Sequence, residues 1–243
     1  MNFKKVVKSV LKLMGYTISP KYKQKKSTYY INASETVKAA KAQGKTVREY
    51  VEELWEQKGC TEKVIQEMKQ IGALEQCDRI CEIGPGTGRY LDLILLQVVP
   101  KKYEIYEVAD DWAQWLVKNY APTVILQQTD GKSLKDTPDN SCDLVHAHGV
   151  FVYLPFLHCF EYFLEMTKIC KQNGYVVFDF YADEDFDCTV IDNWLNYADR
   201  YPVILPRKTV IKYFENLGFK LISEFKNKHG HSHSHYVMFQ KIN

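Results

Sequence analysis

The segment between residues 79 and 96 constrains the fold of this chain more than any other. An apolar run typical of a strand, Arg79–Ile83, leads into Gly84-Pro85-Gly86-Thr87-Gly88 and then into a helical pattern that starts at Tyr90. Glycines in such a turn remove the Cβ atoms that keep a backbone away from a ligand, and the start of a helix offers free N–H groups. We therefore expect a nucleotide-like molecule at the carboxyl end of this strand.

Strand-like and helix-like segments alternate through the middle of the chain. Helices are expected to begin near Gly88, Asp110 and Leu157. The strand-like runs are Arg79–Ile83, Tyr103–Val108, Val124–Gln128, Cys142–His146 and Gly174–Phe180. This alternation predicts an α/β fold, a Rossmann-like doubly wound sheet that is mainly parallel and has helices on both faces.

The end of the chain has a different pattern. A predicted helix, Arg207–Leu217, is followed by two strand-like runs, Phe219–Phe225 and Tyr236–Lys241, on either side of a polar loop. Neighbouring strands joined by a modest loop favour an antiparallel hairpin. We expect this C-terminal hairpin at the edge of the sheet.

Three helices are predicted before the first strand. Thr46 and Glu49 have the spacing of a capping box, which indicates the start of the second helix. We predict a basic amphipathic extension (1–26), a helical cap (27–72) and a catalytic domain (73–243). The cap helices are expected at Ser34–Gln43, Thr46–Gln57 and Thr61–Ile71.

Charge is distributed unevenly along the chain. Residues 1–26 contain eight of the 32 basic residues and none of the 30 acidic ones, so residues 27–243 carry a net charge of about −6. A body of that sign repels phosphates, so general nucleic-acid binding is disfavoured and no nucleic-acid partner is predicted. The apolar face of residues 1–26 has three interpretations, namely packing on the protein itself, peripheral contact with an anionic membrane and contact with a partner protein.

The cysteines and the lengths of the apolar runs indicate a cytoplasmic protein. The seven cysteines form no C-x-x-C pair, and several stand among apolar residues, as free thiols do in a reducing compartment. No apolar run approaches the roughly 20 residues that a membrane-spanning helix needs.

The spacing around the glycines differs from that of a dinucleotide site. A dinucleotide fingerprint requires a third glycine at position 89, which is Arg89. The pattern is instead E-x-G-x-G-x-G, headed by Glu82. With this motif the chain resembles the class I S-adenosylmethionine-dependent methyltransferase family over about Gly72–Lys241. The resemblance implies S-adenosylmethionine as the cofactor and S-adenosylhomocysteine as the product.

The resemblance also implies which residues bind that cofactor. Glu82 corresponds to the acid near the methionine amino group, Glu107 ends the second strand where an acid accepts ribose hydroxyls, and Asp130 follows the third strand, near the adenine amino group. The cofactor-binding residues expected on this basis are Glu82, Gly84, Pro85, Gly86, Gly88, Glu107, Asp130, Gly131 and His148.

The methyl acceptor is expected beyond the fourth strand. His148 and Tyr153 follow that strand, and a histidine can remove the proton of a hydroxyl acceptor. A structural or cofactor-shaping role for His148 is the alternative. Tyr181 and Asp183, after the fifth strand, are secondary candidates. The Asn-Pro-Pro-Tyr motif of enzymes that methylate planar nitrogens is absent, which favours oxygen as the acceptor atom.

The run His229-Gly-His231-Ser-His233-Ser-His235 has three interpretations. Alternate residues of a strand share a face, as a metal site requires, but no Cys or carboxylate cluster that would supply a third ligand accompanies them. Recognition of the acceptor is the second interpretation, and a solvated hairpin loop is the third and favoured one. We predict no metal site.

The sequence therefore predicts an O-methyltransferase of a small polar molecule. Resemblance to methyltransferases of cell-surface sugars, which share a short basic and apolar amino-terminal helix, favours a sugar or a phosphorylated precursor of a cell-surface glycan. The alternatives are a methyltransferase of a lipid or quinone intermediate and a noncatalytic regulator that binds the cofactor.

Overall fold

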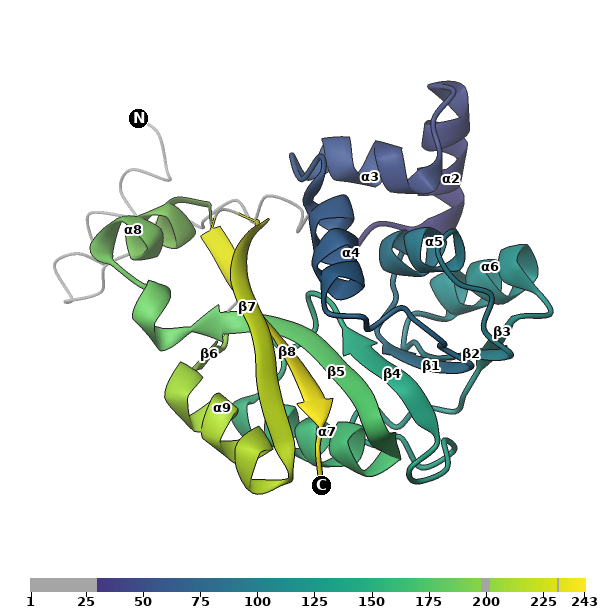
Figure 1. The fold of residues 1–243 in the computed structure, drawn as a ribbon. Coiled ribbons are helices and arrows are strands. Elements are labelled where there is room, and N and C mark those ends of the chain that lie inside the picture. Colours follow the sequence, from purple (N-terminus) through teal and green to yellow (C-terminus); the bar gives the residue numbers. More distant parts are fainter. Residues whose placement is uncertain (1–29, 198–201, 231) are drawn as a thin grey trace, which may run out of the picture.

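An eight-stranded sheet lies at the centre of the structure, a computed structural model that describes residues 30–197, 202–230 and 232–243 (Figure 1). The strand order is β3-β2-β1-β4-β5-β8-β7, with the short β6 paired to β5. Strands β1 to β6 pair in parallel, and β8 is antiparallel to both β5 and β7. The predicted mainly parallel sheet with an antiparallel hairpin at its C-terminal edge is confirmed. The predicted extension 1–26 lies outside the described residues.

The strands agree closely with the apolar runs of the sequence. The first strand has the predicted bounds, whereas the fifth is longer at both ends and carries the chain to Ala182. The strands are β1 (Arg79–Ile83), β2 (Lys102–Tyr106), β3 (Val124–Leu126), β4 (Cys142–Ala147), β5 (Cys170–Ala182), β6 (Ile204–Leu205), β7 (Phe219–His229) and β8 (Ser232–Lys241).

Helices cover both faces of the sheet (Figure 1). The described helices are α2 (Ala33–Ala42), α3 (Val47–Leu54), α4 (Cys60–Gln70), α5 (Arg89–Leu95), α6 (Asp110–Tyr120), α7 (Phe156–Ile169), the 3₁₀ helix η1 (Asp183–Asp185), α8 (Cys188–Tyr197) and α9 (Arg207–Asn216). The predicted capping box is present, because the Thr46 hydroxyl accepts from the Glu49 N–H and the Glu49 carboxylate accepts from the Thr46 N–H. None of the described helices is long and apolar enough to cross a membrane.

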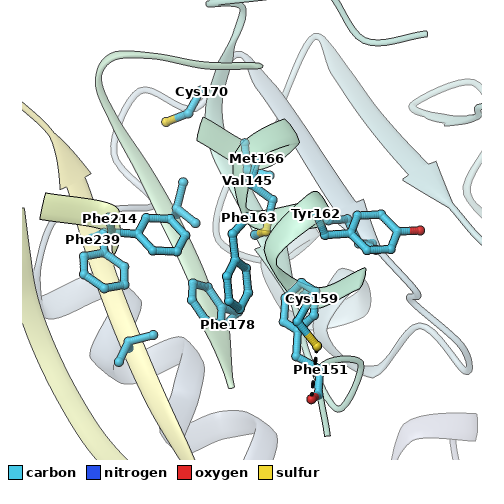
Figure 2. Packing of buried hydrophobic residues seen from close by; sticks show 14 of the residues in the cluster. Val145, Phe151, Cys159, Tyr162, Phe163, Met166, Cys170, Phe178, Phe214 and Phe239 are labelled. Carbon is cyan, nitrogen blue, oxygen red and sulfur yellow. Dashed lines mark hydrogen bonds between the residues drawn. The ribbon is translucent and has the colours of Figure 1, made fainter. Parts of the chain in front are cut away.

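Two hydrophobic clusters form the core, one on each face of the sheet. Alternate residues of a strand point to opposite faces. Ile80 and Leu144 accordingly join the cluster under α4, α5 and α6, whereas Cys81 and Val145 join the cluster under α7 and α9. The second cluster is rich in phenylalanine, as Figure 2 shows, with Phe214 and Phe239 stacked at a ring-centroid distance of 4.4 Å. Because both faces of the sheet are covered, a ligand-binding site is expected at the ends of the strands.

The C-terminal hairpin is longer than the sequence predicted. The expected loop between residues 225 and 236 is instead mostly strand, paired from Phe225↔Tyr236 to His229↔Ser232. The prediction was wrong because antiparallel pairing satisfies the backbone of this polar segment, and the alternate side chains Ser232 and Ser234 are buried. Since β7 runs in the same direction as β4 and β5, its last residue, His229, lies at the edge where the parallel strands end.

Candidate functional site

The glycine turn after β1 lies at this edge of the sheet, and its three glycines differ in what surrounds them. All three have positive φ, between +53° and +75°. A Cβ on Gly84 would lie 2.8 Å from the Val150 side chain, and one on Gly88 would lie 2.5 Å from the Leu116 side chain, so a larger residue at either position would have to displace that neighbour. A Cβ on Gly86 would meet nothing within 4 Å. The turn is therefore open at Gly86.

Glu107, directly after β2, braces this turn. Its carboxylate accepts from the Gly86 N–H at 2.7 Å and from the Ala109 N–H at 2.8 Å. Burial raises the pKa of Glu107, and these backbone hydrogen bonds oppose the rise. A carboxylate held beside an open glycine turn is suited to accept hydrogen bonds from the hydroxyl groups of a ribose.

Glu82, the acid that heads the motif, is enclosed by other polar side chains. It is 1% exposed, and its Oε2 accepts from the Tyr103 hydroxyl at 2.7 Å. Burial raises the pKa of Glu82 to about 8, although the Tyr103 hydrogen bond lowers it in part. The Tyr103 hydroxyl oxygen also lies 3.0 Å from Nε2 of His146. Glu82 is thus part of a buried network, and its carboxyl group is not simply exposed to the turn.

His148 continues this network at the end of β4. Its Nε2 lies 3.0 Å from Nδ1 of His146, and its ring stacks on Tyr90 at a centroid distance of 3.5 Å. Its Nδ1 is buried and has no hydrogen-bond partner among the described residues. Burial holds the pKa of His148 well below its usual range, and the neighbouring His146 and Arg89 lower it further. The imidazole is therefore neutral at pH 7.

Two predicted acceptor residues, Tyr153 and Tyr181, both lie next to His229, which belongs to the histidine run with three possible interpretations. The Tyr153 hydroxyl lies 3.2 Å from Nε2 of His229, and the Tyr181 ring lies 5.8 Å from the His229 ring. His229 comes from the hairpin and covers Gly149, whose Cβ would lie 2.9 Å from its ring. The alternation of His and Ser in the hairpin was the signal for a strand, but only the pairing register shows which histidine reaches this edge.

Asp179 is the group that the sequence analysis missed. It is fully buried on β5, where its Oδ1 accepts from the Gly149 N–H at 2.7 Å. Its Oδ2 has no hydrogen-bond partner in the described part of the chain and lies 3.9 Å from Nδ1 of His229. Burial lowers the pKa of His229, and Asp179 opposes this. An aspartate inside a strand of apolar residues was the available signal.

The remaining predicted residues lie apart from this cluster. Asp130 is exposed, and its carboxylate accepts from the Ser133 hydroxyl and from the N–H groups of Lys132 and Ser133, which lowers its pKa to about 2. Gly131 has a φ of +77° and open space around it. Asp183 is exposed and accepts from the Arg207 N–H at the start of α9, so the structure does not bring it to Tyr153 and His229.

The histidine run does not gather into a metal site in the described residues, and His231 lies outside them. His235 instead lies against acidic side chains, with its Nε2 3.0 Å from Glu224 and its Nδ1 3.4 Å from Asp185. His233 is exposed.

Arg89, which directly follows the glycine turn, contacts the predicted cap. Arg89, the first residue of α5, donates to the Gln57 side chain at 2.9 Å and lies 4.9 Å from the centre of the Trp55 ring. Its charge lowers the pKa of both His148 and His229. The Arg89 guanidinium group is therefore close to both His148 and His229.

The fold has many relatives among solved structures. Magnesium protoporphyrin IX methyltransferase (ChlM) from Synechocystis PCC 6803, with bound SAH, is 11% identical, with 98% of this chain and 99% of that chain covered and a TM-score of 0.59. A putative sarcosine dimethylglycine methyltransferase from Galdieria sulphuraria is 11% identical, with coverages of 83% and 89% and a TM-score of 0.59. The N-methyltransferase NodS from Bradyrhizobium japonicum WM9, in complex with S-adenosyl-l-homocysteine, is 14% identical, with coverages of 74% and 87% and a TM-score of 0.53. At these identities the likeness shows the fold.

Sequence comparison identifies the family. A search of curated proteins finds no match. A family model described as a methyltransferase domain, however, matches residues 46–224, which is most of the chain. The match includes the glycine turn, β4, β5 and most of the predicted cap. The predicted class of enzyme is thereby confirmed, and the chain belongs to the methyltransferase domain family.

Proposed function

We propose that this methyltransferase transfers the methyl group of S-adenosylmethionine to a hydroxyl group of a small polar acceptor. The observation that carries the proposal is the group of ionisable side chains beside the open glycine turn, namely His148, Tyr153, Asp179 and His229. A hydroxyl must lose its proton as it is methylated, and a neutral histidine can accept one. Burial keeps the pKa of both histidines low, so both are neutral at pH 7.

The residues around the turn fit the cofactor. Bound S-adenosylmethionine supplies a methyl group on a positively charged sulfur, which is a good leaving group. Gly86 leaves room for the cofactor, Glu107 would accept the ribose hydroxyls, and Asp130 with Gly131 would border the adenine. Because the reaction is a direct displacement, the main task of these residues is to align donor and acceptor.

We favour a sugar or a phosphorylated precursor of a cell-surface glycan as the acceptor, with a role in polysaccharide biosynthesis. Arg89 supports a phosphorylated acceptor, since its guanidinium donates to the neutral amide of Gln57 and lies near both His148 and His229. Arginine is well suited to bind phosphate. The seven free thiols support a cytoplasmic location.

Calorimetric titration with S-adenosylmethionine and S-adenosylhomocysteine tests the cofactor first. Labelled S-adenosylmethionine is then offered with hexoses, hexose phosphates and catechol as hydroxyl acceptors, and with sarcosine as an amine. We expect micromolar binding of both cofactor forms and transfer to a hydroxyl compound. Transfer to sarcosine alone would contradict an oxygen acceptor, and binding without any transfer would favour the noncatalytic regulator.

A lipid or quinone acceptor requires a separate experiment. Co-sedimentation with vesicles of phosphatidylglycerol compares the full chain with a chain that lacks residues 1–26. A soluble acceptor predicts little sedimentation of either form, whereas sedimentation that is lost with residues 1–26 would support peripheral membrane contact and a lipid-like acceptor.

A further inference from the structure

A continuous series of hydrogen-bonding groups links Glu82 to His148 across three strands. The Glu82 carboxyl on β1 lies 2.7 Å from the Tyr103 hydroxyl on β2, which lies 3.0 Å from Nε2 of His146 on β4. The other ring nitrogen of His146 lies 3.0 Å from Nε2 of His148. Glu82, Tyr103 and His146 are all buried on the sheet face under α4 and α5. We call these four residues the buried chain.

The number of hydrogens fixes how the buried chain is arranged when Glu82 is ionised. A tyrosine hydroxyl has one hydrogen, and a neutral imidazole carries one N–H and one bare nitrogen. An ionised Glu82 can only accept, so Tyr103 donates to it and His146 donates from Nε2 to the Tyr103 oxygen. Nδ1 of His146 then accepts from the Nε2–H of His148. The last atom of the buried chain, Nδ1 of His148, is left bare.

A protonated Glu82 permits the opposite arrangement. Glu82 then donates to the Tyr103 oxygen, Tyr103 donates to Nε2 of His146, and the Nδ1–H of His146 donates to Nε2 of His148. His148 now carries its hydrogen on Nδ1. The two arrangements have the same number of hydrogen bonds and differ in the hydrogen-bonding character of this one buried atom, which has no partner among the described residues.

The surroundings keep both histidines neutral, which the two arrangements require. Burial lowers the pKa of His146 to about 3 and that of His148 well below its usual range. The titratable and charged groups that face the buried chain come from several elements. They are Glu107 and Tyr120 near Glu82, Cys77 and Cys81 near Tyr103, and Arg89, Tyr90 and Tyr236 around His148.

We propose that Tyr103 and His146 are positioning residues that couple the ionisation of Glu82 to the tautomer of His148. The proposal rests on the proposed function. The cofactor ammonium beside Glu82 favours the ionised carboxylate and thereby a bare Nδ1 on His148. His148 then takes the proton of the acceptor hydroxyl while the oxygen–carbon bond forms and the carbon–sulfur bond breaks with its electron pair left on sulfur. Cofactor binding thus prepares the base.

The test follows the histidine tautomers directly by nitrogen NMR of protein labelled with ¹⁵N-histidine. The His148 signals are assigned by their loss in His148→Gln. Between about pH 6 and about pH 9 we expect the ratio of the two His148 tautomers to change by about tenfold or more, from Nδ1–H towards Nε2–H. Saturating S-adenosylhomocysteine at about pH 6 should produce the same change, because its ammonium group favours ionised Glu82.

Two tyrosines on β2 provide matched variants. Tyr103→Phe removes the link and should abolish both responses. Tyr106→Phe removes the hydroxyl of another buried tyrosine on the other face of the strand, where it lies 2.9 Å from the Thr137 hydroxyl, and should leave both responses intact. Glu82→Gln cannot ionise, so its tautomer ratio should not change with pH, which gives a second test if Tyr103→Phe does not fold.

A single His148 tautomer throughout this pH range in the wild-type protein would overturn the proposal. A response in Tyr103→Phe equal to that of the wild type would do so as well. Failure of the cofactor assignment is distinguishable, since calorimetry would then show no binding of S-adenosylhomocysteine while the pH response of the histidines remained.

Discussion

The sequence predicts Glu82 as a cofactor-binding residue, and burial raises the pKa of its carboxyl group. Its pKa is about 8 in the folded protein, against an ordinary value of 4.5, because the ionised form loses its hydration. The Tyr103 hydrogen bond offsets only part of that cost. The protein therefore keeps a protonated acid at neutral pH inside its core. At the scale of single residues, substitutions of Glu82 and Gly86 have effects that can be measured.

The first effect is a dependence of stability on pH. Folded Glu82 holds its proton more tightly than the unfolded side chain does, so its contribution to stability is complete below about pH 4.5 and is lost as the pH rises through about 8. Relative to Glu82→Gln, the wild-type free energy of unfolding should fall by up to about 4 kcal/mol from pH 5 to pH 9. Urea unfolding of both proteins across this range measures the difference. Parallel curves would show that Glu82 titrates normally.

The second effect separates backbone strain from cofactor binding at Gly86. Gly86→Ala should cost about 1 to 2 kcal/mol of stability because its φ is +53°. Gly44 is a matched control, since it has a φ of +64°, has open space around it and lies remote from the site between α2 and α3. Both variants should lose similar stability in thermal unfolding, but only Gly86→Ala should weaken binding of S-adenosylhomocysteine, by about tenfold or more. Equal cofactor affinity in the two variants would place the cofactor elsewhere.

At the scale of elements, the same chain contains helices defined locally and a hairpin defined by its neighbours. Helix α3 is short, and its start is fixed by the reciprocal hydrogen bonds of Thr46 and Glu49. Pairing with β5 holds β8 in the sheet up to His235, whereas the polar tip beyond that residue pairs only between the hairpin's own strands, as far as His229↔Ser232. Local chemistry predicts the first element well and the second only in part.

The capping box of α3 gives a prediction at this scale. Thr46→Ala removes the side chain that accepts from the Glu49 N–H and should lower the free energy of unfolding by about 1 kcal/mol. Thr46→Ser keeps the hydroxyl and should have nearly wild-type stability. Chemical denaturation of the three proteins measures this. A loss of the same size in Thr46→Ser would mean that the threonine methyl group, and not the cap, matters.

At the scale of the whole molecule, the two core clusters hold the strand ends in place. The cluster under α7 and α9 contains stacked phenylalanine rings, with Phe163 on Phe178 and Phe214 on Phe239 (Figure 2). Phe178 also belongs to β5, the strand that carries Asp179 towards His229. Core packing and site geometry are therefore linked through one strand.

Removing one of these rings should show how much the aromatic cluster contributes to the free energy of unfolding. Phe178→Ala should cost about 3 to 5 kcal/mol of unfolding free energy, because it deletes a fully buried ring and leaves a cavity. Phe156 on α7 is 44% exposed, and Phe156→Ala should cost less than about 1 kcal/mol. Urea denaturation of both variants provides the comparison. Similar losses in the two would show that this cluster repacks around the missing ring.

The sequence by itself determined the class of fold, most element positions and the family. These depend on short-range signals, such as the glycine turn after Arg79–Ile83, the alternation of apolar runs and the capping residues of α3. Each acts within a few residues, so a linear pattern suffices to detect it.

Only the tertiary structure decided which polar groups meet at the carboxyl edge of the sheet. Asp179 and His229 are 50 positions apart in sequence, and they come together because β8 inserts between β5 and β7 and thereby makes β7 parallel to β5. The burial that raises the pKa of Glu82 and lowers that of His148 likewise depends on helices packed over the sheet. Strand order, register and desolvation are properties of contacts between distant segments, and a local pattern does not contain them.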